Sequence, residues 1–232
     1  MFFFHGIFKT FRSSYDFTQG ELAKQLSLEQ ITIANYESGK ATPSILVLKK
    51  MIDLYGVSFD YFAQNNECQY PRNLKLLKLS KILDIEAFSE ARSSIEGVVK
   101  PLMSKYSSSN KILKQDNLEI NLSKEFNNNL KEIRGTRKLN QPQLSKAIGI
   151  SRSLLTQYEY NKCYPSIDKL YSLSTALDVS MHALITGEKL SFHFDDGIFG
   201  RTILTADSLL SIEDQKIIIQ LLEAIINNPK KS

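Results

Sequence analysis

The sequence predicts an all-α protein that contains two copies of one helical module. Apolar residues recur at helical spacing along almost all of its 232 residues, and strict alternation is confined to a few residues near 190–194. Residues 11–62 align without a gap to residues 133–184, with thirteen identities in fifty-two positions. A repeated constellation of residues is a stronger signal than a single motif match, so we expect a tandem duplication.

The start of a helix is marked at the same place in both copies. Thr18 and Glu21 have the spacing of a capping box, in which each side chain satisfies a free backbone amide of the other residue. Asn140 and Gln143 repeat this spacing, and Pro142 is tolerated because first-turn amides have no helical partner. These patterns predict helices over about 18–25 and 140–147.

A tight turn and a further helix are expected next in each copy. In the second copy Gly149 suits a turn that needs positive φ, and Ser151 is a good N-cap. In the first copy Ser27 replaces the glycine and Glu29 stands at the cap position. An alternative is that Ser27 and Gln30 cap a helix that begins two residues earlier.

Each copy is followed by a segment with helical apolar spacing. Ser211 and Asp214 can cap a last helix whose broad apolar face includes Ile217, Ile218, Leu221, Leu222, Ile225 and Ile226. After the first copy we expect helices over about 72–83 and 85–104, where Asp84, Glu86, Ile95, Val98 and Val99 form a similar pattern. The predicted organisation is a first module over 1–62, a helical connector over 63–105, a flexible Ser/Asn/Lys-rich linker over 106–121, a second module over 122–187 and a tail over 188–232.

Charge and cysteine usage narrow the class of protein. The chain has a net charge of +4, and residues 122–187 hold nine Lys/Arg against five Asp/Glu while residues 1–62 hold six of each. The second module is therefore the stronger candidate for binding a polyanion. Cys68 and Cys163 are far apart, and His193 lies near only two aspartates, so we expect no metal site and no cofactor. No signal peptide or membrane span is predicted, which favours a soluble cytoplasmic protein.

The combined motifs resemble a known family. The pattern TQxELAxxL…YExGKxxP, followed by a Leu-rich helix and Val-Ser, resembles the helix-turn-helix family of the phage lambda repressor and Cro, also called the Xre family of transcriptional regulators. The resemblance covers about residues 8–62 and 126–187. It implies two five-helix DNA-binding domains in tandem, each with its second helix across the DNA backbone and its third, the recognition helix, in the major groove.

The resemblance also implies roles for individual residues. Because Leu155 and Tyr158 are expected in the core, the outer face of the second recognition helix carries residue types that contact base edges. The implied DNA-binding residues of the second module are Gln141, Ser151, Arg152, Ser153, Thr156, Gln157 and Lys162, and those of the first are Gln19, Gln30, Ile31, Asn35 and Lys40, with Gln19 and Gln141 on phosphates. Arg12 with Glu37, and Arg134 with Glu159, are implied to be structural ion pairs.

The leading prediction is a sequence-specific, non-enzymatic regulator of transcription, a repressor, whose partner is double-stranded DNA. An alternative is a protein-interaction or antitoxin-like role in which the first module binds a partner, since Glu29 and Ile31 weaken its DNA-binding face. The duplication suggests that one chain replaces the two subunits of a dimer. A competing expectation is a homodimer formed through the C-terminal helix, with Ile218, Leu222 and Ile225 in the interface.

Overall fold

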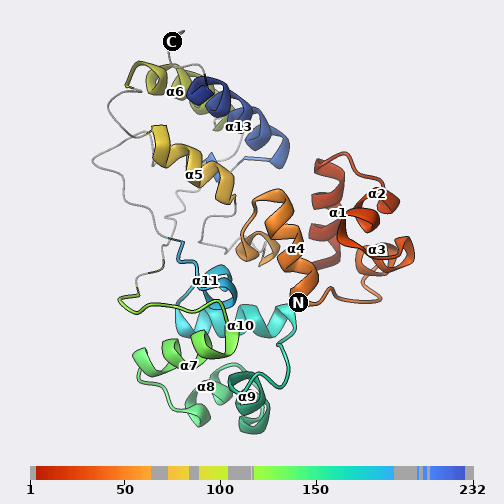
Figure 1. Cartoon of the computed structure of the whole chain (residues 1–232), viewed down its shortest axis with the longest axis vertical. Coiled ribbons are helices and arrows are strands. Elements are labelled where there is room, and N and C mark those ends of the chain that lie inside the picture. Colours follow the sequence, from red (N-terminus) through yellow and green to blue (C-terminus); the bar gives the residue numbers. More distant parts are fainter. Residues whose placement is uncertain are drawn as a thin grey trace. The chain divides into compact units, whose positions relative to one another are not determined.

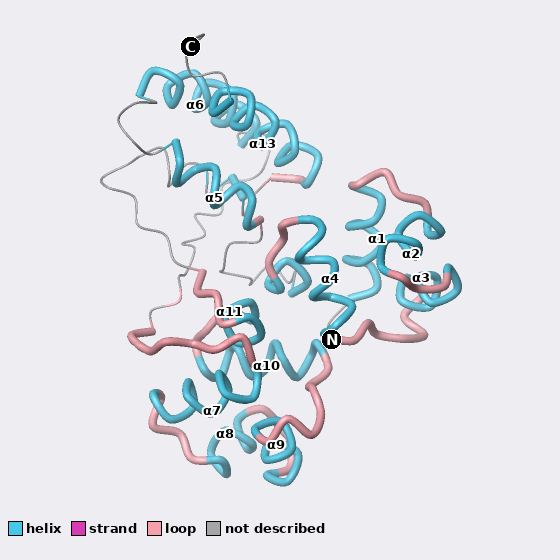
Figure 2. Tube along the Cα trace, viewed as in Figure 1, coloured by secondary structure: helices cyan, strands magenta, loops and turns pink. Residues whose placement is uncertain are grey.

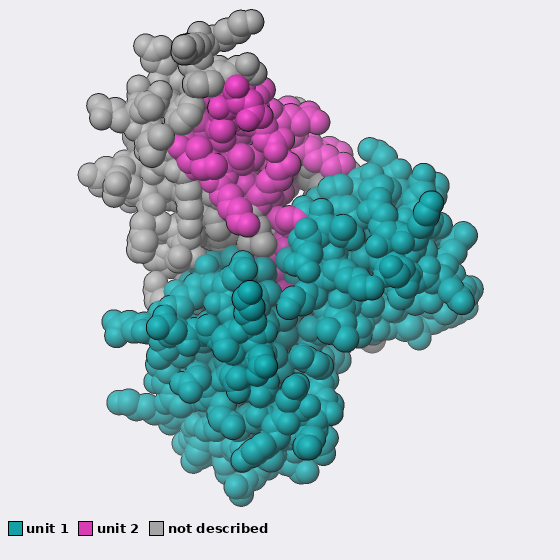
Figure 3. All heavy atoms as spheres, viewed as in Figure 1, with its two compact units in different colours: residues 1–55, 62–68, 115–191 teal, residues 56–61, 69–114, 192–232 magenta. Residues whose placement is uncertain are grey.

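In the computed structural model, residues 4–63, 73–83, 89–103, 116, 118–190, 203, 206–207 and 210–227 are described. Their regular structure is helical apart from one isolated bridge between Val57 and Asn73, which confirms the all-α fold class (Figure 2). The chain forms two compact units, coloured in Figure 3. Unit 1 comprises residues 1–55, 62–68 and 115–191 and contains the second helix-turn-helix module and most of the first; unit 2 comprises residues 56–61, 69–114 and 192–232.

Module 1 contains four α-helices and a closing 3-10 helix (Figure 1). They are α1 (Phe4–Ser14), α2 (Gln19–Leu26), α3 (Gln30–Glu37), α4 (Ile45–Tyr55) and η1 (Phe59–Ala63). Its core is rich in aromatic residues. Phe11 is fully buried, with its ring centroid 4.9 Å from that of Tyr15 and 5.1 Å from that of Tyr55.

Module 2 repeats this order, with a fifth α-helix in place of η1. Its helices are α7 (Phe126–Thr136), α8 (Gln141–Ala147), α9 (Arg152–Glu159), α10 (Ile167–Leu177) and α11 (Met181–Thr186). Leu130, Leu144, Leu155 and Leu170, one from each of the first four helices, are fully buried. Burial of such side chains stabilises the fold by about 1.5–3 kcal/mol each, and Leu155 contributes this burial from α9.

The predicted helix starts are confirmed in both modules. Thr18 and Asn140 are the N-caps of α2 and α8, and both capping boxes are formed. Ser151 caps α9, and its hydroxyl accepts a hydrogen bond from the backbone N–H of Leu154 at 3.1 Å. Because Ser27 has φ of 58° and ends α2, the alternative in which it caps an earlier start of the next helix is wrong. Gly149, at the aligned position of module 2, has φ of 64°. The two modules therefore make the same turn, the first with a serine and the second with a glycine.

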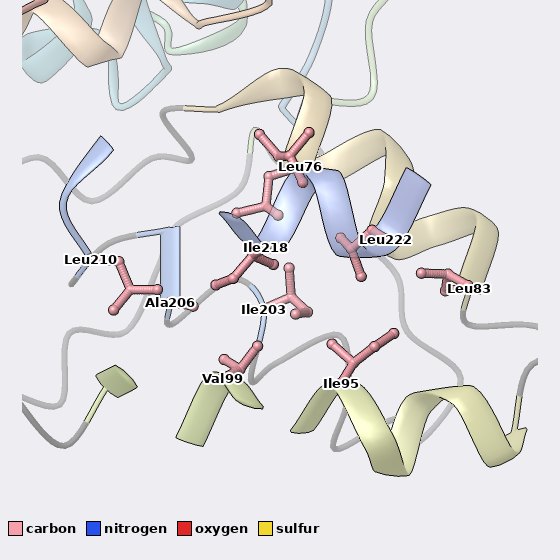
Figure 4. Close-up of a cluster of buried hydrophobic side chains, with 10 residues drawn as sticks. Leu76, Leu83, Ile95, Val99, Ile203, Ala206, Leu210, Ile218 and Leu222 are labelled. Atoms are coloured by element: carbon pink, nitrogen blue, oxygen red, sulfur yellow. The ribbon is translucent and has the colours of Figure 1, made fainter. Parts of the chain in front are cut away.

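Unit 2 contains α5 (Leu74–Leu83), α6 (Ser89–Met103) and α13 (Ile212–Asn227). Figure 1 shows α13 beside α5 and α6, and it packs against both. Their buried side chains form one cluster with residues 203, 206 and 210 (Figure 4). Two expectations are corrected here. The two tails do not form separate copies, and Ile218 and Leu222, expected between two chains, are buried within one.

The chain is packed onto module 2 earlier than residue 122, where the sequence placed the end of the linker. Both side-chain oxygens of Asp116 are used: the backbone N–H of Ser180 donates to Oδ1 at 2.6 Å, and that of Leu190 donates to Oδ2 at 2.7 Å. Leu118 is also buried. Burial raises the pKa of Asp116, against the opposing effect of these donors. Most of the expected linker, residues 106–115 and 117, and the expected cap at Asp84 lie outside the described residues.

Candidate nucleic-acid interface

A buried ion pair joins the first helix of each module to its third. In module 2, Arg134 Nε donates to Glu159 Oε1 at 2.5 Å and Arg134 Nη2 donates to Glu159 Oε2 at 3.2 Å. Arg12 and Glu37 repeat both distances in module 1. The Glu159 side chain is only 1% exposed and that of Arg134 is 17% exposed. Such a two-bond pair can fix the orientation of one helix on the other, and the structural role implied by the family resemblance stays a prediction.

A glutamine from the start of the second helix completes each ion pair. Gln19 Nε2 donates to Glu37 Oε2 at 2.8 Å, and Gln141 Nε2 donates to Glu159 Oε2 at 2.7 Å. These two glutamines were expected on phosphates. The amide nitrogen of glutamine carries two hydrogens, and the bond to the glutamate uses one of them. The second hydrogen could be donated to a phosphate.

Electrostatics favour the ionised form of the carboxylate in module 1. Burial raises the pKa of Glu37, but hydrogen bonds from Arg12 and Gln19 and the charge of Arg12 outweigh it, so that the pKa lies below its usual value. The acid is therefore held as a carboxylate at neutral pH. Its negative charge, at the end of α3, is matched within the module by Arg12.

The outer face of α9 carries the residues that the sequence expected there. Ser151, Arg152, Ser153 and Gln157 are exposed and Thr156 is half-buried. Arg152 Nε lies 3.4 Å from Gln141 Oε1, and Thr156 Oγ1 lies 3.5 Å from the same oxygen. The glutamine that holds Glu159 thus also contacts two side chains of the recognition helix. Preorganised side chains lose less freedom on binding than mobile ones do.

The corresponding face of α3 is less polar. Gln30 is exposed, Asn35 is half-buried and Ile31 is 61% exposed. Glu29 is the N-cap of α3 but makes no capping hydrogen bond with its side chain. Gln30 and Ala34 stand at the positions of Arg152 and Thr156, so α3 lacks the guanidinium and the hydroxyl that contact Gln141 Oε1 in module 2.

Both recognition helices are followed by a residue in the left-handed conformation. Gly39 has φ of 74° and Asn161 has φ of 55°. Lys40 and Lys162 come next and both are exposed. The backbone N–H of Lys162 donates to the carbonyl of Gln157 at 2.9 Å, which holds this loop against the end of α9.

Comparisons with known proteins agree with this geometry. Residues 8–62 and residues 127–190 each match a helix-turn-helix family model. The chain is 30% identical over 101 residues to the HTH-type transcriptional regulator YqaE of Bacillus subtilis (strain 168), covering 44% of this chain and 86% of that protein. The chain belongs to the Xre family of helix-turn-helix transcriptional regulators. It is thus a DNA-binding protein that regulates transcription.

The match to a second relative spans a smaller share of that relative's length. The chain is 33% identical over 66 residues to the HTH-type transcriptional activator BcrR of Enterococcus faecalis, which is 28% of this chain and 32% of that activator. No solved structure matches. The described helices of this regulator include none that is long and apolar enough to cross a membrane, and its described residues include no group of three or more His, Cys, Asp or Glu suited to a metal.

The structure adds an aromatic and basic cluster to module 2 that sequence analysis missed. Tyr160 and Tyr164 are both exposed in the loop after α9, on either side of Lys162. Lys131 Nζ lies 4.7 Å from the centroid of the Tyr160 ring, within the range of a cation–π contact. In module 1 the aligned positions hold Ser38 and Thr42. Comparing the two copies outside their shared motifs would have identified these tyrosines.

Proposed function

We propose that the regulator binds duplex DNA sequence-specifically through module 2, with α9 in the major groove. The observation that supports this proposal is the set of exposed side chains at the start of α9. Gln141 contacts both Glu159 and Arg152 and so helps to hold Arg152 in place. Arg152 suits guanine, since a guanidinium can donate two hydrogen bonds to O6 and N7, and Gln157 suits adenine.

The surroundings of α9 supply contacts to the DNA backbone in this proposal. Lys162 and the second amide hydrogen of Gln141 are donors for phosphates, and module 2 has more basic than acidic residues. Two further exposed groups, Tyr160 and Tyr164, flank the same loop. Phosphate contacts release counterions, so binding should weaken steeply as salt is added.

The test is a titration of labelled duplexes, selected by the full chain from a random pool, at several salt concentrations. We expect a defined consensus and a linear fall of log affinity with log salt, and Lys162→Ala should reduce that slope by about 1. Lys146→Ala, an exposed lysine on α8 that makes no proposed DNA contact, is the matched control. Binding without a consensus and without a salt dependence would refute the proposal.

We further propose repression as the direction of regulation, by a bound regulator that covers a promoter. One relative, BcrR of Enterococcus faecalis, is named as a transcriptional activator. Whether this regulator lowers or raises the expression of a reporter gene is therefore a direct test of the proposal. A reporter gene placed behind the selected consensus should be expressed less when the regulator is present, and less reduction is expected with Arg152→Ala. Increased expression would reverse this proposal while leaving DNA binding intact.

We propose as a second candidate function that module 1 binds a protein partner in place of DNA, and the observation that favours it is the exposed apolar surface of this module. Ile31 and Leu46 are each 61% exposed, whereas the aligned residues of module 2 are Ser153 and Asp168. Exposed apolar side chains of this size favour a protein partner over phosphates. Ile31→Ser should leave DNA affinity unchanged if module 1 binds protein, and should weaken one half of the selected site if it binds DNA.

A further inference from the structure

The segments that follow the two modules share one hydrophobic core. α5 and α6 follow module 1 and α13 follows module 2, yet Leu76, Val99 and Ile218 are buried in the same cluster (Figure 4). Lys75 on α5 also pairs with Glu223 on α13 at 2.7 Å. Ile218 and Leu222, which could have joined two chains, are therefore already covered by the chain itself.

A buried polar network specifies this pairing. The backbone N–H of Asn73 donates to Asp207 Oδ1 at 3.0 Å, and Asn73 Nδ2 donates to Gln215 Oε1 at 3.2 Å. Gln215 Nε2 in turn donates to the carbonyl of Asp207 at 2.9 Å. All three residues are buried. Buried polar groups are costly when unsatisfied, so this network favours the partner that satisfies it.

The network is also unlike the contacts of a symmetric dimer. In a two-fold interface, the same surface patch is used on both partners. Here Asn73, from the segment after module 1, meets Asp207 and Gln215, from the segment after module 2. The contact joins two different surfaces and is complete within one chain. Unit 2 thus joins the segment after module 1 to the segment after module 2, as a dimer interface joins two subunits.

The two recognition helices present different chemistry to DNA. Among the exposed and half-buried side chains of α3, Gln30, Ile31 and Asn35 are the ones implied to contact DNA. Glutamine and asparagine pair with adenine, and an apolar side chain contacts the methyl group of thymine, so this set selects A·T pairs. On α9, Arg152 adds a donor pair for guanine. A symmetric site would present the wrong bases to one of the two helices.

We infer that the regulator binds as a monomer to one asymmetric site with two unlike half-sites: a guanine-containing half-site for module 2 and an A·T half-site for module 1. This inference rests on the proposed function, because it takes both recognition helices to enter the major groove. The half-sites are expected about 10 base pairs apart, one turn of the duplex, as they are for dimeric members of this class of DNA-binding protein.

The first experiment uses the unmodified chain. Duplexes selected from a random pool are sequenced, and sedimentation velocity measures the mass of the free protein and of its complex with the selected duplex. We expect a monomer, one chain per duplex and a consensus without two-fold symmetry. A dimer bound to a palindrome would overturn the inference alone. A monomer without affinity for any duplex would overturn the proposed function, and the inference with it.

The second experiment separates the role of unit 2 from that of the modules. Ile218→Asp places a charge in the core of unit 2, and Ile217→Asp is the matched control because the neighbouring Ile217 is 51% exposed. Ile218→Asp should lower affinity for the two-part site about 100-fold, since the modules lose their mutual positioning. Its affinity for a duplex with only the guanine half-site should equal that of the unmodified chain, which also reports that module 2 is folded. Equal affinities of both variants for the two-part site would overturn the assigned role of unit 2.

Discussion

Removing Glu159 tests the ion pair that holds α7 on α9. Glu159→Ala leaves three donors without their acceptor: Nε and Nη2 of Arg134 and Nε2 of Gln141. Because the Glu159 side chain is 1% exposed and Arg134 is 17% exposed, the guanidinium would remain largely away from water. Breaking a buried pair by removing one partner costs about 3–5 kcal/mol. For a domain of this size, even the lower value corresponds to a fall in melting temperature of about 12 °C.

The assay is thermal unfolding of the full chain, followed by circular dichroism and calorimetry. Glu159→Ala should lower the transition of module 2, and Glu37→Ala should lower that of module 1, which assigns the two transitions. Glu132→Ala, an exposed glutamate on α7, should change stability by less than about 0.5 kcal/mol. Combining Arg134→Met with Glu159→Leu should restore most of the loss, since no buried charge is then left unpaired. Unchanged melting of Glu159→Ala, together with a selective loss of DNA affinity, would refute the structural role.

Three further predictions concern α9, the turn before it and the response to acid. Arg152→Ala should cost about 1–3 kcal/mol of binding free energy and relax selectivity at one base pair; an unchanged selected consensus would remove Arg152 from the base contacts. Gly149→Ala should destabilise module 2 by about 1–2 kcal/mol through its backbone conformation alone, because φ is 64° and an added Cβ meets nothing within 4 Å; Ser27→Gly should stabilise module 1, and equal melting temperatures would contradict both. The pKa of Glu37 is lower in the folded protein than in the unfolded chain, where it is about 4.3. The ionised carboxylate therefore stabilises module 1 fully above the unfolded pKa, and this stabilisation is lost as pH falls through the folded pKa. Glu37→Gln should thus make the unfolding free energy of module 1 depend less on pH in acid.

The local structure of the modules could be predicted from sequence because its determinants lie within a few residues of each other. Capping boxes at Thr18 and Asn140, and the turn at Gly149, depend on neighbouring groups and on glycine's freedom at positive φ. The Arg–Glu pairs span 25 residues and were accessible only through the family resemblance. The position of Gln141 between Glu159 and Arg152 was not accessible, since a first-turn glutamine has many rotamers and only the folded module selects one.

Unit 2 illustrates why the sequence of an apolar helix face does not predict which segment or chain it packs against. The spacing of Ile218, Leu222 and Ile225 predicts a buried face, and burial in another chain or in the same chain satisfies that pattern equally. Asn73 and Gln215, which distinguish the two outcomes, are 142 residues apart and have no periodic relation to each other. Their buried amides bond to each other and to Asp207, as well as to the backbone N–H of Leu76 and the carbonyl of Leu210. We therefore infer that the polar residues decide which segment α13 pairs with, while the apolar residues supply the free energy. Substituting Asn73 should thus alter what α13 pairs with, whereas substituting Ile218 should alter whether it is packed at all.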